Sequence, residues 1–167
     1  RDYSTEKQEA TQKGKGLFVG KPVSDISVKI IDSDKLTQNI NDFSSIECKT
    51  GEIVVSGEHV LKGYLNGEGD SENKIHLNNQ IWHRTGDAGY FDENGDLWLL
   101  GRYSQRVEYK GEFIYPFAIE AAFYDKGYKT ALVKHNNKIT LISENNRPSE
   151  NLLKAFNIEN CIVIHLL

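Results

Sequence analysis

The stretch from Trp82 to Arg102 constrains the fold of this 167-residue chain more than any other part of it. It contains three short strand-like runs, at residues 82–84, 88–91 and 97–100. Asn94-Gly95 lies between the last two runs, and both residues tolerate the positive φ that a tight hairpin requires. The stretch therefore predicts antiparallel β-structure with a hairpin at Asn94-Gly95.

Short β-like runs separated by turns extend over the whole region from Gly16 to Gly101. Ile26–Ile31 alternates apolar and polar residues, which is typical of a half-buried strand. Ser33–Lys49 is expected to be a polar, exposed connection. Several short strands with regularly placed turns predict a small antiparallel β-barrel subdomain.

After Arg102 the pattern predicts a mixed α+β domain. A tight hairpin is expected around Lys110-Gly111-Glu112. Pro116 stands where a helix would begin, because proline is favoured at the first helical position. Ser149 is expected to cap a second helix that extends to Phe156. Strand candidates lie at residues 130–134, 139–142 and 161–165.

The predicted fold class is therefore mixed, with the antiparallel β-barrel subdomain followed by a small α+β domain. The first fifteen residues are polar and lack a periodic apolar pattern, so they are predicted to be a loop or linker. The best candidate boundary lies at Gly101-Arg102. The expected division is a linker at 1–15, the barrel at 16–101, a junction at 102–106 and an incomplete α+β domain at 107–167.

Composition excludes several classes of protein. A net charge of −4 gives no basic footprint, so no nucleic-acid partner is expected. No apolar run reaches about 18 residues, so no transmembrane segment is expected. Cys48 and Cys161 lack metal-ligand spacing, so no metal site is predicted among the residues of the chain. Without a signal-like start, we expect a cytoplasmic protein. The absence of methionine leads us to expect an internal fragment.

Asp87 and Arg102 are the candidate ligand-binding residues. Asp87 follows Gly86 in a predicted turn, where its two carboxylate oxygens can accept from a pair of adjacent hydroxyls, as on a ribose. Arg102 follows Gly101 at a strand end, and its guanidinium suits phosphate or ribose oxygens. From the residues alone, the alternative stays open that Asp87 only caps a turn and Arg102 is a solvated surface charge.

Three motifs in order resemble the acyl-adenylate-forming enzymes, which include acyl-CoA synthetases, the adenylation domains of nonribosomal peptide synthetases, and luciferases. The first is Gly51–Gly57 followed by Leu61–Leu65, the second is Trp82–Tyr90, and the third is Asp92–Arg102; the resemblance extends over residues 16–123. It implies an AMP-forming acid ligase that uses ATP and Mg²⁺ to activate a carboxylate, a fatty acid being favoured, as acyl-AMP with release of pyrophosphate. The acyl group would then pass to CoA or a similar acceptor.

The same resemblance assigns roles to single residues. Asp87 would bind the ribose hydroxyls of ATP, and Arg102 would bind the ribose or phosphate side of the nucleotide. Ser104 would be the hinge about which the α+β domain moves as a lid, and Gly111 would lie in a loop on the acceptor side. The magnesium ion would be held largely by the triphosphate.

Departures from the family pattern limit what the resemblance implies. Ser104 replaces the usual Asp or Lys of the hinge, and the chain contains neither a phosphate-binding loop nor the family's late lysine. We therefore expect a carboxyl-side fragment without catalytic residues of its own, inactive alone, whose main partner is the missing amino-terminal part of the same chain. The run from Gly101 to Val107 with Tyr115-Pro116 is similar to the olefin-biosynthesis branch, the β-lactone synthetases.

Two other functions stay open at this stage. The first is a non-catalytic module derived from this family that binds an adenylate or another protein. The second is an unrelated β-rich binding domain that happens to carry similar motifs.

Overall fold

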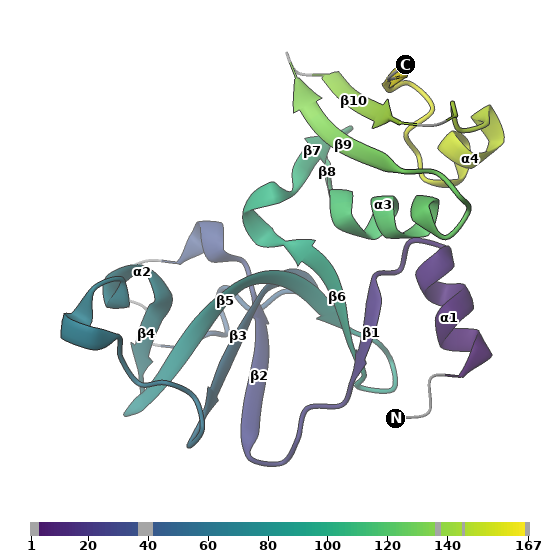
Figure 1. Ribbon diagram of the computed structural model, residues 1–167. Helices are drawn as coiled ribbons and strands as arrows, with labels where there is room; N and C mark the ends of the chain where they lie inside the picture. Colours follow the sequence, from purple (N-terminus) through teal and green to yellow (C-terminus); the bar gives the residue numbers. More distant parts are fainter. Residues whose placement is uncertain (1–3, 37–41, 136–137, 145, 166–167) are drawn as a thin grey trace. The chain divides into compact units, whose positions relative to one another are not determined.

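The computed structural model describes residues 4–36, 42–135, 138–144 and 146–165 (Figure 1). The chain forms two compact units. The first, here called the sheet unit, is Phe18–Leu99. The second, the α+β unit, combines residues 1–17 with Leu100–Leu167.

One curled sheet of six strands forms most of the sheet unit (Figure 1). Its strands are β1 (Leu17–Gly20), β2 (Ile26–Ile31), β3 (Thr50–Gly57), β4 (Lys74–Leu77), β5 (Gln80–Phe91) and β6 (Leu97–Arg102). Their order is β1-β6-β5-β3-β2, with β4 also paired to β5. Among the described residues β1 and β2 each pair with one strand, so the sheet is an open half-barrel that ends at these two strands.

Short helical turns connect these strands. They are η1 (Ser33–Lys35), η2 (Leu65–Gly67) and α2 (Asp70–Asn73). The hairpin predicted between β5 and β6 is confirmed, with Gly95 at φ +75° and its N–H donating to the Asp92 carbonyl over 3.0 Å.

Both faces of the sheet carry apolar packing. Neighbours on one strand point to opposite faces, and Ile53 and Val54 accordingly belong to two different clusters of buried side chains. Phe43 and Ile46 are each 4% exposed, and the Phe43 ring meets Trp82 edge-on at 5.1 Å. The prediction that Ser33–Lys49 is only an exposed connection was wrong for these two residues, because they pack in one buried cluster with Val54 and Trp82 of the sheet. Part of that connection, 37–41, lies outside the described residues.

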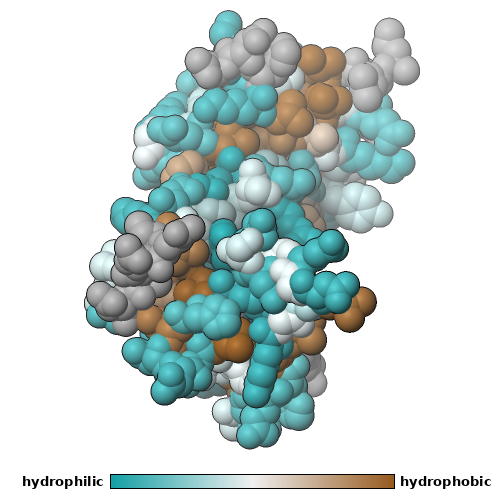
Figure 2. Space-filling view, turned by 90° about the vertical axis from the view of Figure 1, so that its left-hand side faces the viewer, coloured by the Kyte–Doolittle hydropathy of each residue, from teal (hydrophilic) through white to brown (hydrophobic). Residues whose placement is uncertain are grey.

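The α+β unit contains helices and two small sheets. Its elements are α1 (Thr5–Gln12), η3 (Tyr103–Gln105), β7 (Val107–Tyr109), β8 (Glu112–Ile114), α3 (Pro116–Tyr124), β9 (Thr130–His135), β10 (Lys138–Ser143), α4 (Glu150–Ala155) and β11 (Ile162–His165). Strand β10 pairs with β9 antiparallel and with β11 parallel, and β7 pairs with β8. The core includes Phe123, Leu141, Leu153 and Ile158. Figure 2 shows hydrophobic surface over this unit, at the top of the view, and Val133, Ile162 and Ile164 are exposed.

Local signals in this unit are confirmed. Pro116 is the first residue of α3, and the Ser149 side chain accepts from the Leu152 N–H at the start of α4. Lys110 and Gly111 have φ of +54° and +81° in the turn between β7 and β8.

The loop predicted for the first fifteen residues is wrong over Thr5–Gln12, which forms α1. This helix buries none of its residues, so it has no apolar periodicity to reveal it. It packs against α3 and belongs to the α+β unit. The domain division at 101/102 stays a prediction.

Candidate functional site

A bulge in β5 carries Asp87. Strands β3 and β5 pair Glu52 with Ala88 and Val54 with Arg84, and the register shifts between these pairs. Residues 85–87 of β5 therefore lie opposite the single residue Ile53 of β3. Such an excess of residues forces one strand out of the ladder and re-aims its side chains.

Gly86 gives the bulge its backbone shape. Its φ is +72°, a left-handed conformation that costs glycine little and other residues more. The Thr85 hydroxyl donates to the Ile53 carbonyl at 2.8 Å, and the Asp87 N–H donates to the Thr85 hydroxyl at 3.1 Å. Thr85 and Gly86 thus shape the turn, while the half-buried Asp87 lies at its end.

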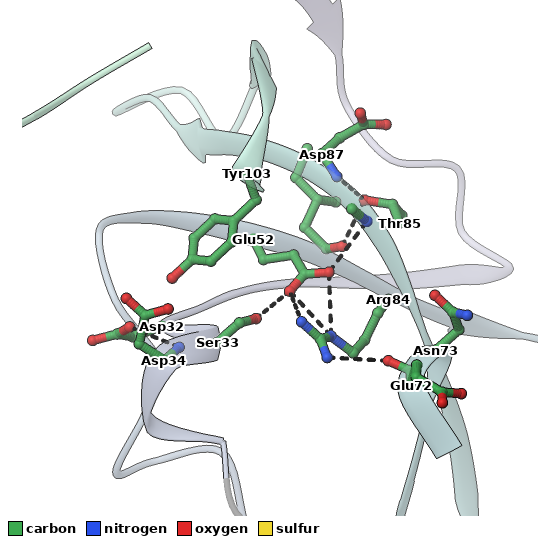
Figure 3. Close-up of polar contacts among 12 residues, drawn as sticks. Asp32, Ser33, Asp34, Glu52, Glu72, Asn73, Arg84, Thr85, Asp87 and Tyr103 are labelled. Carbon is green, nitrogen blue, oxygen red and sulfur yellow. Dashed lines mark hydrogen bonds and ion pairs between the residues drawn. The ribbon is translucent and has the colours of Figure 1, made fainter. Parts of the chain in front are cut away.

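A buried carboxylate lies beside the bulge (Figure 3). Glu52 is 2% exposed, and its Oε2 accepts from Arg84 Nη2 at 2.7 Å. Arg84 Nε lies 3.1 Å from Oε2, Gly86 N–H donates to Oε1 at 3.2 Å, and the Ser33 hydroxyl donates to Oε2. Arg84 Nη1 also donates to the Glu72 carbonyl of α2 at 3.0 Å. Each oxygen of this buried carboxylate therefore has hydrogen-bond partners, and the carboxylate is paired with a cation.

Sequence reasoning did not identify Glu52, Arg84 or Ser33. A signal was present, because Glu52 directly precedes the apolar run Ile53-Val54-Val55 of the same predicted strand, and a charge buried in a strand requires a partner. The partner could not be deduced, because Arg84 lies 32 positions away.

Arg102 ends β6 in the α+β unit, and its side chain is exposed. Gly101 precedes it with φ +122°, and a Cβ there would lie 2.6 Å from Cβ of Phe117. Glycine is therefore required at this position both for its conformation and for the close approach of α3. The predicted ligand residues thus divide between the units, with Asp87 in the sheet unit and Arg102 in the other.

Ser104 and Gly111 also lie in the α+β unit. Ser104 is exposed within η3, directly after Arg102. Gly111 is exposed at the tip of the β7–β8 hairpin, with open space around its Cβ position. Beside it, Lys110 Nζ lies 3.1 Å from Glu159 Oε1, and this contact raises the pKa of Lys110.

Tyr90 lies on β5 three residues after Asp87. Burial raises the pKa of its hydroxyl, and the nearby Asp92 carboxylate raises it further. The ring stacks on Trp98 at 6.4 Å, which fixes the strand just beyond Asp87.

The described residues include no group of three or more His, Cys, Asp or Glu side chains that could hold a metal ion. Within the same residues, no helix has the length and apolar character needed to cross a membrane.

No protein-family model matches the chain, whereas many curated relatives do, and two of them illustrate the similarity. The 2-succinylbenzoate–CoA ligase of Bacillus licheniformis is 38% identical over 105 residues, which cover 61% of this chain and 19% of the relative. The olefin β-lactone synthetase of Xanthomonas campestris pv. campestris is 34% identical over 136 residues, covering 74% of this chain and 24% of the relative. The chain thus spans about a fifth to a quarter of the length of these relatives.

Solved structures share the fold. The O-succinylbenzoate coenzyme A synthetase of Bacillus subtilis, unliganded, matches with a TM-score of 0.64 and 23% identity over 89% of this chain and 33% of that chain. The same enzyme in complex with AMP matches with a TM-score of 0.62 and 24% identity over 89% and 31%.

Proposed function

Because the chain belongs to the acyl-adenylate-forming ligases, we propose that the whole protein activates a carboxylic acid with ATP. An acid oxygen would attack the α-phosphorus, releasing pyrophosphate and leaving an acyl-AMP. A second step would transfer the acyl group to CoA or a similar acceptor, with release of AMP. The names of two curated relatives, a 2-succinylbenzoate–CoA ligase and an olefin β-lactone synthetase, support this reaction class.

Asp87 is the residue that carries this proposal. It follows a glycine with positive φ in a bulge whose backbone is fixed by hydrogen bonds. A carboxylate held in this way can accept from both adjacent hydroxyls of the ATP ribose. Binding in the acyl-AMP would use the same pair of bonds, so Asp87 would hold the nucleotide through both half-reactions.

Arg102 would bind ribose or phosphate oxygens from the α+β unit. Its exposed side chain and the fork of guanidinium donors support that role. Ser104, in the exposed turn η3, would absorb the φ/ψ change as the α+β unit moves as a lid. Gly111, in the exposed hairpin tip, would then approach the acceptor.

Magnesium would neutralise charge on the transferred phosphates when bound. The described residues offer no carboxylate cluster for it, so no residue of this chain is assigned to the ion. The acid need not be a fatty acid, because 2-succinylbenzoate is the acid named for one relative. We propose a cytoplasmic location for the whole protein.

Pyrophosphate release by the whole protein tests the proposal, measured across a panel of aliphatic and aromatic carboxylic acids. Asp87→Ala should raise the KM for ATP by about ten- to a hundredfold, the range expected when one or more charge-assisted hydrogen bonds are lost. Asp25→Ala, at an exposed carboxylate of the same unit, is the matched control. An unchanged KM for ATP in Asp87→Ala would overturn the ribose assignment.

A second candidate function is suggested by Ser104. If the shortened hinge side chain prevents the lid from alternating, the protein would bind an adenylate without catalysis. ATP binding that depends on Asp87, without pyrophosphate release for any acid, would favour this function over the ligase.

A further inference from the structure

We propose that Glu52 is a positioning residue for nucleotide binding, acting through the bulge that presents Asp87. This inference rests on the proposed function of Asp87 as the ribose ligand. Glu52 itself does not touch the nucleotide in this scheme. Its carboxylate instead holds two groups that precede Asp87 on β5, the Gly86 backbone N–H and the Arg84 guanidinium.

The bulge creates a need for hydrogen-bond acceptors. Residues 85–87 lie opposite one residue of β3, so their N–H groups cannot all continue the regular ladder. Buried backbone N–H groups that lack an acceptor are costly. Glu52 Oε1 supplies an acceptor to the Gly86 N–H at 3.2 Å, at the residue whose φ is +72°.

The second oxygen of the same carboxylate anchors the arrangement. Oε2 accepts from Arg84 Nη2 at 2.7 Å and from the Ser33 hydroxyl. Arg84 and Gly86 flank Thr85, so one carboxylate binds both sides of the residue on which the Asp87 N–H is bonded. The direction of the Asp87 side chain therefore depends on Glu52 through two short connections along the backbone.

The network also ties the bulge to segments outside β5. Ser33 belongs to η1, the turn that follows β2, and Arg84 Nη1 reaches the Glu72 carbonyl of α2. Segments η1 and β5 thus meet at the Glu52 side chain, which is 2% exposed, and α2 joins the network through Arg84 (Figure 3). A buried group with this many donors has little freedom to move, which is what a positioning residue requires.

A carboxylate suits this place and an amide does not. Both oxygens of Glu52 accept, Oε1 from the Gly86 N–H and Arg84 Nε, and Oε2 from Arg84 and Ser33. Glutamine has one acceptor oxygen, and its NH₂ group can only donate. In Glu52→Gln the NH₂ group must face either the Gly86 N–H or Arg84 Nη2, neither of which can accept, so one of these hydrogen bonds is lost while the side-chain volume stays nearly constant.

The test compares Glu52→Gln with Glu47→Gln in the whole protein. Glu47 is the matched control, because it lies in the same unit in an exposed pair with Lys29. Pyrophosphate release gives the KM for ATP, the KM for the acid and kcat, and Asp87→Asn measures how much the ribose ligand contributes. The ¹⁵N–¹H resonance of the Gly86 amide reports the bulge directly and does not depend on turnover.

Glu52→Gln should raise the KM for ATP by about tenfold, the equivalent of one charge-assisted hydrogen bond to the nucleotide, and should shift the Gly86 resonance. The KM for the acid should change by less than about twofold, because Glu52 acts only on the nucleotide side in this proposal. A merely structural defect would instead lower the active fraction, and therefore kcat, without a selective effect on the KM for ATP. Glu47→Gln should leave all four measurements as in the parent.

Two results would overturn the inference, and they are distinguishable. If Glu52→Gln keeps the parental KM for ATP while Asp87→Asn raises it, the positioning role is refuted and the ribose assignment stands. If Asp87→Asn also keeps the parental value, the ribose assignment fails and the role of Glu52 toward the nucleotide fails with it. Should Glu52→Gln not fold, Arg84→Lys is judged by the same comparison, since it keeps a cation beside Glu52 but lacks the fork.

Discussion

Replacing Gly89 by alanine tests whether β5 requires a residue without a side chain where β6 passes it. A Cβ at this position would lie 2.5 Å from the Trp98 carbonyl oxygen and 2.8 Å from Ile53 Cδ1. Gly89 is not among the glycines with positive φ, so its backbone conformation would accept alanine. The cost of the substitution is therefore steric.

The size of that cost follows from the contact with Trp98. Ordinary contact begins at 3.4 Å, so β5 and the carbonyl must separate by about 0.9 Å, whereas the end of Ile53 can rotate away. Overpacking of this kind costs about 1–3 kcal/mol. Alanine returns about 0.4–1 kcal/mol by restricting the unfolded chain. The net loss of about 1–2 kcal/mol corresponds to a midpoint about 1–2 M lower in urea at a slope of about 1 kcal/mol/M, the low end of the range for small proteins.

Urea unfolding followed by tryptophan fluorescence measures this loss. Trp82 and Trp98 are 4% and 5% exposed and both belong to the sheet unit, so their emission reports that unit. Gly95→Asn is the control, because no atom beyond Gly95 and its two chain neighbours lies within 4 Å of that Cβ position, and asparagine tolerates the φ of +75°. A midpoint for Gly89→Ala equal to that of Gly95→Asn would refute the steric account.

Three further predictions concern the described contacts. Arg84→Met should lower the free energy of unfolding of the sheet unit by about 3–5 kcal/mol, because it leaves Glu52 buried without its cation; a fluorescence midpoint equal to the parent's would show that the pair is not needed. Ser149→Ala should lower the free energy of unfolding by about 1 kcal/mol through loss of the α4 cap, measured by circular dichroism during urea unfolding. An unchanged midpoint would show that the Ser149 cap does not contribute to stability. A hydrogen bond from its own backbone N–H, followed by one from Lys110, lowers the pKa of Glu159. Its stabilising contribution is therefore present above the ordinary glutamate pKa and is lost as the pH falls through the lowered value. Glu159→Gln should flatten this acid limb of the stability profile, and identical limbs would contradict the assignment.

The local features of the fold could be predicted because their causes lie within a few residues. Asn94-Gly95 accommodates positive φ, Pro116 begins a helix without losing a needed N–H, and Ser149 bonds to Leu152 three positions on. None of these depends on the rest of the chain. Helix α1 lacked such a cue, because it has no buried face and its Ser4 cap makes no side-chain bond.

The candidate site was predicted in part for the same reason. Asp87 could be singled out because it directly follows Gly86, and the order of motifs pointed to a nucleotide. The hydrogen-bond network of Glu52 beside it could not be predicted, because Glu52 and Arg84 are 32 positions apart and meet only when β3 pairs with β5.

The sequence by itself determined the turns, caps and strand alternation, together with the order of motifs that resembles the acyl-adenylate-forming ligases. The tertiary structure decided that the sheet is open, that Phe43 and Ile46 are core residues, and that Glu52 lies buried beneath the Asp87 bulge. The physical reason is that turn and cap energies are set by neighbouring residues, whereas burial and strand register are set by distant segments that must pack together. The role of Glu52 in β3 is evident only once its partner Arg84 in β5 is located.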